Sequence, residues 1–447
     1  MSRLQPIIQI AGGGLAGTEA AWQLAHAGIH VILWEMRPVR TTPAHQTDRL
    51  AELVCSNSLK SDQHPSASWL LKDELRRLGS LLIAIADQAR VPGGQALTVD
   101  RESFSELITQ RIAANPLIEI RREEFTQIDP EAITIIATGP LTSDTLAAEI
   151  ARITGSGRLY FYDSISPIVD ATTVDESIAF RASRYDKSLD GTGDYLNCPF
   201  DKQEYDRFVD ALMAAQTVDS HIPDDVPYFE SCLPIEEIAR RGRDTLRFGP
   251  MKPMGLVDPR TGRRPYAAVQ LRLENLRADS YNLVGFQNHL KFGEQKRILR
   301  MIPGLANAEF FRFGQIHRNT YINAPALLNA TLQLRANANI LFAGQISGVE
   351  GYVESIATGL LAGRFALALA AGQPVSPLPR ETALGSLCHY ISGADSRHYQ
   401  PANIAMDLFP PLDTSTANRL RHDKPARHAE ICRRAQSALE SFMSVGV

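Results

Sequence analysis

The 447-residue sequence lacks the marks of several protein classes. Its five cysteines are scattered, with no CxxC pair and no His/Cys cluster at metal-ligand spacing, which argues against disulfides and a metal site. Its net charge is −4, so nucleic acid would need a local basic patch. No run approaches the roughly 20 apolar residues of a membrane span, and the apolar start at 6–11 is too short for a signal peptide. These absences favour a reduced, cytoplasmic protein.

What is present begins with a strand-helix-strand pattern near the N-terminus. Residues 6–11 (PIIQIA) predict a buried strand, 16–27 predict a helix by their apolar period, and 30–35 (HVILWE) predict a second strand. The three segments have the order and length of the β-α-β unit that opens nucleotide-binding domains.

The first turn of this unit carries the dinucleotide fingerprint Gly12-x-Gly14-x-x-Gly17. Gly12 permits the tight turn, Gly14 lets the backbone approach a pyrophosphate, and Gly17 lets the helix pack closely on the strand. The helix N-terminus offers N–H groups and a positive dipole end to phosphates. Glu35 ends the second strand, where its carboxylate can accept both ribose hydroxyls. The predicted dinucleotide-binding residues here are Gly12, Gly13, Gly14, Leu15, Ala16, Gly17 and Glu35.

The order of strand, glycine-rich turn and long helix is repeated at 339–370. A further apolar strand is predicted at 132–140. In two-piece flavin domains the later turn contacts the flavin end, so the pattern favours FAD over NAD, with Gly344 and Gln345 near the cofactor. We therefore predict an α/β fold: a discontinuous FAD-binding, Rossmann-like domain of the glutathione-reductase type with an inserted α+β domain. The expected limits are 1–150 for the first part of the FAD domain, 151–324 for the inserted substrate domain, and 325–447 for the second part of the FAD domain together with the C-terminal helices.

Two cysteines lie in unusual settings. Cys55 follows a strand-like approach in AELVCSNSLKS, and Cys232 in YFESCLPIEEIARRG precedes Pro234 and a Glu-rich turn, which mark a helix start. A thiol at a helix N-terminus is stabilised as the thiolate and becomes a nucleophile. A buried core position is the alternative for any cysteine, and it is the expectation for Cys198, Cys388 and Cys432.

A basic segment runs from 239 to 275 in this otherwise acidic chain. Arginines interleaved with Phe248 and Tyr266 suit phosphate pairing and stacking of RNA bases. A solvated surface, or phosphate contacts to a small cofactor, is the alternative. The candidate RNA-binding residues are Arg240, Arg241, Arg243, Arg247, Lys252, Arg263 and Arg264.

Taken together, the motifs resemble the folate- and FAD-dependent tRNA uracil-C5 methyltransferases. The matching stretches, between residue 11 and about residue 364, are GGGLAGTEAAWQLA, EMRP, TPAHQT, AELVCSNSL, LLKDELRRLGSL, VDRESF, YFESCLPIEEIARRGRDTLRFGPMKP, NLVGFQNHLKFGEQKRILRMIPGL, HRNTYINAP and FAGQISGVEGYVESIATGLLAG. Gly13, Gly93, Gln95 and the segment after Cys55 depart from the family pattern without removing a group that the chemistry needs.

The resemblance implies methylation of the T-loop uridine of tRNA (position 54) at C5, giving ribothymidine. The carbon would come from methylenetetrahydrofolate through reduced FAD, with NAD(P)H restoring the electrons. Cys55 and Cys232 match the family's catalytic cysteines: one adds to uracil C6 and the other assists loss of the C5 proton. We expect Cys232 to be the nucleophile, and His289 and Tyr352 to stack on the pterin, with a purely structural role as the alternative for both. No feature indicates an obligate protein partner.

Three other functions compete with this one. A sister family of FAD enzymes modifies the wobble uridine with a partner GTPase, but its chains are longer, with a C-terminal helical domain. A general NAD(P)H-dependent flavin oxidoreductase would not need the basic segment or the two placed cysteines. A non-catalytic tRNA-binding module could keep flavin as a structural ligand.

Overall fold

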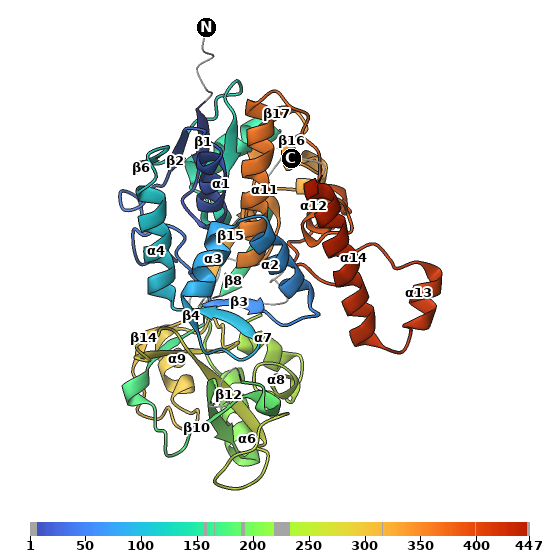
Figure 1. Cartoon of the computed structure of the whole chain (residues 1–447). Coiled ribbons are helices and arrows are strands. Elements are labelled where there is room, and N and C mark those ends of the chain that lie inside the picture. Colours follow the sequence, from blue (N-terminus) through green and yellow to red (C-terminus); the bar gives the residue numbers. More distant parts are fainter. Residues whose placement is uncertain are drawn as a thin grey trace.

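The computed structural model describes residues 7–155, 159–164, 166–188, 193–218, 233–314, 316–397 and 399–444. Within these ranges, the strands form two six-stranded sheets, a three-stranded sheet and a two-stranded ribbon. The two large sheets lie in two parts of the molecule, one above the other in the view of Figure 1.

The first large sheet has the order β16-β17-β7-β1-β2-β6 and is parallel except for its β16–β17 edge. Its strands are β1 (Ile8–Ala11), β2 (Val31–Trp34), β6 (Ile118–Arg121), β7 (Thr134–Ile136), β16 (Gln333–Leu334) and β17 (Asn337–Phe342). The predicted strands at 6–11, 30–35 and 132–140 are confirmed, because β1, β2 and β7 fall inside them. Segments over 300 residues apart in the chain are therefore brought into one sheet, which β17 joins by pairing with β7.

Two helices that follow glycine-rich turns pack against each other on this sheet. They are α1 (Leu15–His26) after β1 and α11 (Tyr352–Ala370) after β17, drawn dark blue and orange in Figure 1. A Cβ atom at Gly359 would lie 2.3 Å from the Ala16 carbonyl oxygen, so the two backbones touch. This contact brings the two glycine-rich turns side by side.

By length and composition, α11 could also cross a membrane, which the sequence-based prediction overlooked. Its most apolar window has a mean hydropathy of 1.4, but 67% of that window is buried inside the fold. Burial against α1 accounts for this apolar character, because a core helix needs apolar residues on most of its surface.

Other elements surround the first sheet. The helices are α2 (Ala67–Arg77), α3 (Leu81–Gln88), α4 (Arg101–Ala113), α5 (Asp144–Thr154), α10 (Ala324–Leu327), α12 (Ala383–Gly393), α13 (Thr414–Arg419) and α14 (Lys424–Ser444). The small sheet contains β3 (Ser58–Ser61), β4 (Arg90–Val91) and β5 (Ala96–Val99), and it lies where the two parts of the molecule meet (Figure 1).

The second large sheet has the order β10-β11-β12-β13-β9-β14, and its neighbouring strands are antiparallel. Its strands are β9 (Ile168–Asp170), β10 (Phe180–Ala182), β11 (Tyr195–Phe200), β12 (Ala267–Leu273), β13 (Ser280–Leu283) and β14 (Phe310–Arg312). Helices α6 (Lys202–Met213), α7 (Ile235–Arg240), α8 (Thr245–Phe248) and α9 (Phe292–Leu299) accompany it. The ribbon of β8 (Leu159–Ser164) and β15 (Ile316–Tyr321) connects this part to the first.

Each large sheet has its own hydrophobic core. The first core takes buried residues from 8–150 and again from 321–439, and the second takes them from 169–308. The chain thus leaves the first core once and returns to it. The domain limits at 150 and 324 stay predictions.

Candidate active site

A cleft with about 1000 Å³ of empty space, including open solvent at its mouth, lies at the carboxyl ends of β1, β2, β7 and β17. Its lining joins the two glycine-rich turns, as expected at this edge of a parallel sheet. Of the residues predicted from sequence, those that line it are Gly12, Gly13, Gly14, Leu15, Ala16, Glu35, Gly344, Gln345 and Tyr352. Gly17 lies behind it, buried within α1.

The three glycines of the fingerprint have different surroundings. A Cβ atom at Gly12 would lie 2.5 Å from the Ala137 carbonyl oxygen, and at Gly17 it would lie 1.8 Å from that of Gly12. A Cβ atom at Gly14 would meet nothing within 4 Å. Gly14 is also the N-cap of α1 and offers no side-chain cap, so the first turn of the helix is open to an anion. The turn therefore fits the pyrophosphate of a dinucleotide.

Glu35 lies in the cleft, but Arg37 already occupies its carboxylate. One oxygen accepts from the Arg37 backbone N–H (3.0 Å) and Nε (2.9 Å), and the other accepts from Arg37 Nη2 and Gly13 N–H (both 3.1 Å). Burial alone would raise the pKa of Glu35, but the bonds and charge of Arg37 lower it below its ordinary value. Ribose hydroxyls must compete with Arg37 for this carboxylate, which the sequence pattern did not reveal.

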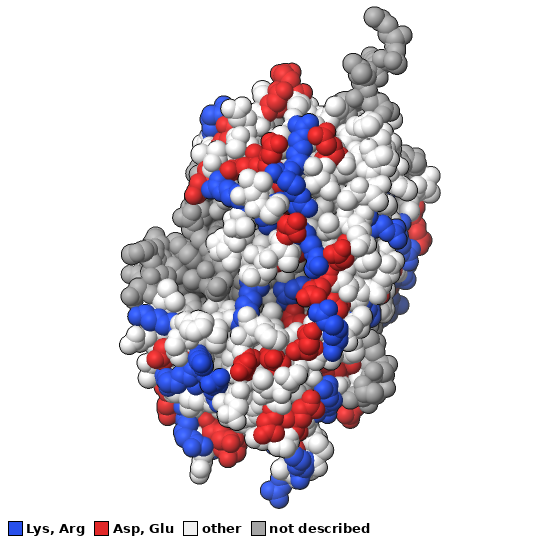
Figure 2. Space-filling view, turned by 90° about the vertical axis from the view of Figure 1, so that its left-hand side faces the viewer, with Lys and Arg blue, Asp and Glu red and all other residues white. Residues whose placement is uncertain are grey.

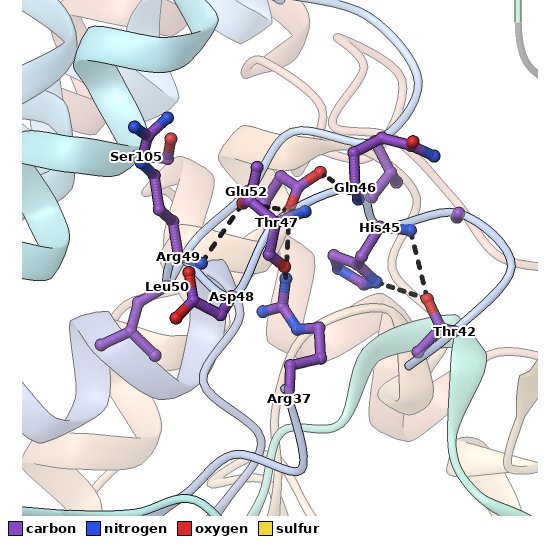
Figure 3. A network of polar contacts seen from close by, with 12 residues as sticks. Arg37, Thr42, His45, Gln46, Thr47, Asp48, Arg49, Leu50, Glu52 and Ser105 are labelled. Atoms are coloured by element: carbon purple, nitrogen blue, oxygen red, sulfur yellow. Dashed lines mark hydrogen bonds and ion pairs between the residues drawn. The ribbon is translucent and has the colours of Figure 1, made fainter. Parts of the chain in front are cut away.

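Arg37 belongs to a network that sequence reasoning missed (Figure 3). Its Nη1 donates to Glu52 (3.2 Å) and to the Thr47 carbonyl (3.1 Å). His45 also lines the cleft, with Nδ1 2.6 Å from the Thr42 hydroxyl. Burial and the nearby charge of Arg37 lower the pKa of His45 to about 4, so its imidazole is neutral at pH 7. The stretch TPAHQT contains this histidine and was the only available signal for it.

The stretch AELVCSNSLKS (residues 51–61), called the Cys55 segment below, is attached to the cleft through Tyr352. The Tyr352 hydroxyl accepts hydrogen bonds from the N–H groups of Cys55 (2.8 Å) and Ser56 (3.0 Å). Burial raises the pKa of Tyr352 well above its ordinary value, so the hydroxyl stays protonated. Val54 lines the cleft directly, which brings the half-buried Cys55 to its edge. Pterin stacking by Tyr352 stays a prediction, whereas its hydroxyl contacts are an additional finding.

Three arginines hold the same segment from other elements. Arg101, the first residue of α4 after the Asp100 cap, donates to the Leu53 carbonyl. Arg312, at the end of β14, donates to the Val54 carbonyl (3.1 Å). Arg272 of β12 donates to the Ser56 hydroxyl (2.7 Å) and the Asn57 side chain (2.8 Å). The Cys55 segment is therefore clamped between the two parts of the molecule.

Two lysines support the strand that follows. Lys72 of α2 is buried and donates to the carbonyls of Leu59 (2.9 Å) and Ser61 (2.8 Å). Lys60 pairs with Glu354 in the first turn of α11 (3.0 Å). The Cys55 segment thus has fixed contacts at both ends, which favours a defined position for the thiol.

Cys232 lies outside the described residues, so its position relative to Cys55 stays a prediction. The helix start expected after it is confirmed, because α7 begins at Ile235 with Pro234 as N-cap and two glutamates in its first turn. His289 packs against this turn: its Nδ1 lies 2.8 Å from Glu236, and the ring is 6% exposed. His289 is not among the described residues that line the cleft, so its stacking role stays a prediction.

Carboxylates accompany three of the six predicted RNA-binding arginines. Arg240 pairs with Glu237, Arg243 with two aspartates of α6, and Arg247 with Asp244. Arg241 has a further interaction and is exposed. Lys252, Arg263 and Arg264 are exposed and form no ion pair with a described carboxylate. Figure 2 likewise shows basic and acidic side chains interspersed over one face.

The remaining cysteines confirm the core expectation. Cys198, Cys388 and Cys432 are buried, and burial raises their pKa values to about 12, about 12 and about 11. In the part of the chain that the structure describes, no group of three His, Cys, Asp or Glu side chains could hold a metal ion.

Comparison with known proteins agrees with this geometry. The family model for glucose inhibited division protein A (GidA) matches residues 7–374. The structure of Aquifex aeolicus GidA superposes with a TM-score of 0.69 at 16% identity, covering 98% of this chain and 75% of that one, which shows a shared flavoprotein fold.

Curated relatives are much closer in sequence. The chain is 70% identical over 436 residues to the methylenetetrahydrofolate--tRNA-(uracil-5-)-methyltransferase TrmFO of Solibacter usitatus, covering 97% of this chain and 98% of the relative. The proteins of the same name from Koribacter versatilis and Geobacter sulfurreducens are 61% and 54% identical, covering 97% and 94% of this chain and 97% and 96% of their own lengths. These matches confirm the resemblance seen in the motifs: the chain belongs to the GidA family and, within it, to the TrmFO methyltransferases.

Proposed function

We propose that this chain transfers the one-carbon unit of methylenetetrahydrofolate to C5 of the T-loop uridine of tRNA (position 54), giving ribothymidine. The observation that carries this proposal is the 70% identity, over 97% of the chain, to a relative named for that reaction. The clamped Cys55 segment beside a dinucleotide cleft supports it, because the reaction needs, besides the thiolate that adds to C6, a group that assists loss of the C5 proton.

We assign the cleft to FAD. The open first turn of α1 would hold the pyrophosphate, with the backbone of Gly13 and Gly14 around it. Gly344 and Gln345 would lie against the flavin end of the cofactor. Glu35 would accept hydrogen bonds from the ribose hydroxyls in place of those it now accepts from Arg37. Bound there, FAD supplies carrier and redox chemistry, with NAD(P)H as the proposed source of electrons.

The two catalytic cysteines remain as assigned by the family resemblance. One thiolate adds to uracil C6, and the other group takes the proton from C5 once the new bond has formed; the first thiolate then leaves C6. We assign the addition to Cys232 and place Cys55 at the cleft edge. His289 and Tyr352 are proposed to contact the pterin, and residues 151–324 are proposed as an inserted substrate domain. A cytoplasmic location stays a prediction.

The test is a reconstitution with purified protein, unmodified tRNA transcript, methylenetetrahydrofolate and NADPH. Nucleoside mass spectrometry should detect 5-methyluridine with folate and reductant, and none when S-adenosylmethionine replaces folate. Fragment mapping should place it in the T-loop; modification at the wobble uridine would favour the sister family. NADPH oxidation without any modified nucleoside would favour a small-molecule oxidoreductase, and tRNA binding without either would favour a binding module.

The binding of tRNA is predicted to depend on the arginines without carboxylate partners. A double change of Arg263→Ala and Arg264→Ala should weaken tRNA binding and lower the salt slope by about one for each phosphate that is no longer neutralised. Arg243→Ala is the matched control, because two α6 aspartates already neutralise that side chain. Filter binding at several salt concentrations measures the tRNA affinity and the salt slope of each variant. Equal losses of affinity in both variants would contradict the prediction.

A further inference from the structure

Arg101 and Arg312 approach the Cys55 segment from separate elements and meet there. Their guanidinium groups bind the carbonyls of Leu53 and Val54, the two residues before Cys55. Arg312 Nη2 also donates to the Ala44 carbonyl (3.1 Å). Carbonyl groups carry no net charge, so these bonds orient the two cations without neutralising them.

Each guanidinium group has one nitrogen that donates no hydrogen bond to a described residue. Arg101 Nη2 and Arg312 Nε are buried, and neither has a hydrogen-bond partner among the described residues. A buried N–H of a cation without an acceptor is costly unless a negative charge lies close by. Both groups therefore favour an anion near the segment that they hold.

The electrostatic effects agree with this geometry. Burial lowers the pKa of the Arg312 guanidinium and the charge of Arg101 lowers it further, which shows that the two cations repel each other, whereas Cys55 raises it. For Arg101, burial acts against the charge, but Glu274, together with smaller effects of Tyr352 and Cys55, raises the pKa above its ordinary value. A negative charge at Cys55 would therefore favour the charged form of both arginines.

Among the residues that the structure describes, the other charged groups around Cys55 leave this balance positive. Glu274 pairs with Arg101 (2.8 Å) and offsets one of the cations. Glu52, in the same segment as Cys55, is used by Arg37. Arg272 adds another cation from β12, Lys60 is paired with Glu354 of α11, Tyr352 stays protonated, and His45 is neutral.

We propose that Arg101 and Arg312 keep the Cys55 sulfur ionised at neutral pH and are therefore positioning residues for the reaction. The S–H bond breaks, its proton passes to solvent, and the electron pair remains on the sulfur of the residue that follows the two carbonyls held by these guanidinium groups. A thiolate is also the form of cysteine that can accept the C5 proton, the role left to Cys55 when Cys232 adds to C6. The use of that thiolate rests on the proposed function, but its ionisation does not.

The experiment measures the ionisation without measuring methylation. The flavin-loaded full-length chain is alkylated with iodoacetamide across a pH series, and the rate at Cys55 is read from its peptide by mass spectrometry. The midpoint for Cys55 should lie below about 8.5, the value of an ordinary thiol. In Arg101→Gln and in Arg312→Gln it should rise by about one pH unit.

Two further variants separate charge from damage to the fold. Glu274→Gln removes the carboxylate that opposes ionisation of Cys55, so the alkylation midpoint of Cys55 should fall in this variant. If the change only loosened the segment, the midpoint should instead rise, as in Arg101→Gln. Arg101→Lys keeps the charge and should keep the low midpoint. Arg433→Gln, an exposed residue paired with Glu430 on α14, is the control for overall charge and should change nothing.

A midpoint near 8.5 in the parent chain, or an unchanged midpoint in both arginine variants, would overturn the proposal. A fall in Glu274→Gln with a rise in the arginine variants supports it. A separate assay of Cys55→Ala for 5-methyluridine distinguishes the two ideas: retained methylation would remove the proposed catalytic role, while the alkylation profile of the parent chain would still decide the ionisation.

Discussion

Gly17→Ala is expected to give a chain that neither folds stably nor retains flavin. The added Cβ atom would lie 1.8 Å from the Gly12 carbonyl oxygen, a backbone atom that cannot rotate away. Separating β1 from α1 would disturb the central sheet and the α1–α11 packing, at a cost above about 3 kcal/mol, the upper end for ordinary overpacking. Thermal unfolding and the flavin content after purification measure the effect.

Gly14→Ala is the matched control in the same turn. Its Cβ atom would meet no atom within 4 Å, and the φ of −78° suits alanine, so the flavin-free chain should melt close to the parent. Because Gly14 lines the cleft, the methyl group should stand where a pyrophosphate approaches and weaken FAD binding about tenfold or more. If Gly17→Ala folds and binds FAD normally, or if Gly14→Ala leaves FAD affinity unchanged, the assigned cradle is wrong.

Tyr352→Phe is expected to lower methylation turnover at least about tenfold while flavin remains bound. The change removes the acceptor of two amides, those of Cys55 and Ser56, and an unsatisfied buried donor costs about 1–3 kcal/mol. The segment should relax and move the thiol from its position, and a small displacement at a reacting group is enough for such a loss. The measurements are single-turnover methylation and the flavin absorbance spectrum.

Tyr205→Phe is the control for losing a buried tyrosine hydroxyl. Its hydroxyl donates to the Arg243 carbonyl in the second core (2.7 Å), far in the chain from Cys55, so turnover should stay near the parental value. The pair also tests pterin stacking, because phenylalanine keeps the ring. Normal turnover in Tyr352→Phe combined with lost folate affinity in Tyr352→Leu would show that the ring matters and the hydroxyl does not.

The local sequence pattern was sufficient to predict the strands and the helix of the first nucleotide-binding unit. The strand, glycine turn and helix around Gly12 depend on neighbours in the chain, so β1, α1 and β2 appear within a residue or two of their predicted bounds. Glu35 was correctly placed at the end of β2. Its occupation by Arg37 was not predictable, because that depends on the path of the loop after the strand.

Charge counting along the chain did not reveal which basic side chains have carboxylate partners. In the sequence, the arginines between 240 and 247 form a basic segment. In the structure, Arg243 forms ion pairs with Asp206 and Asp210 of α6, which lie more than 30 residues away in the chain. The sequence contains these aspartates without indicating that they face the arginine. The seven candidate RNA-binding residues stay predictions, of which Lys252, Arg263 and Arg264 form no ion pair with a described carboxylate.

By itself, the sequence determined the family, the two glycine-rich units and the identity of Cys55 as a candidate reactive residue, because each depends on residue types at short spacing. Only the tertiary structure decided what surrounds Cys55. The Tyr352 hydroxyl and the Arg312 guanidinium reach this segment from 297 and 258 residues away, respectively. Such contacts arise when helix and sheet packing bring distant segments together, and the polar groups buried there must then find partners across the fold.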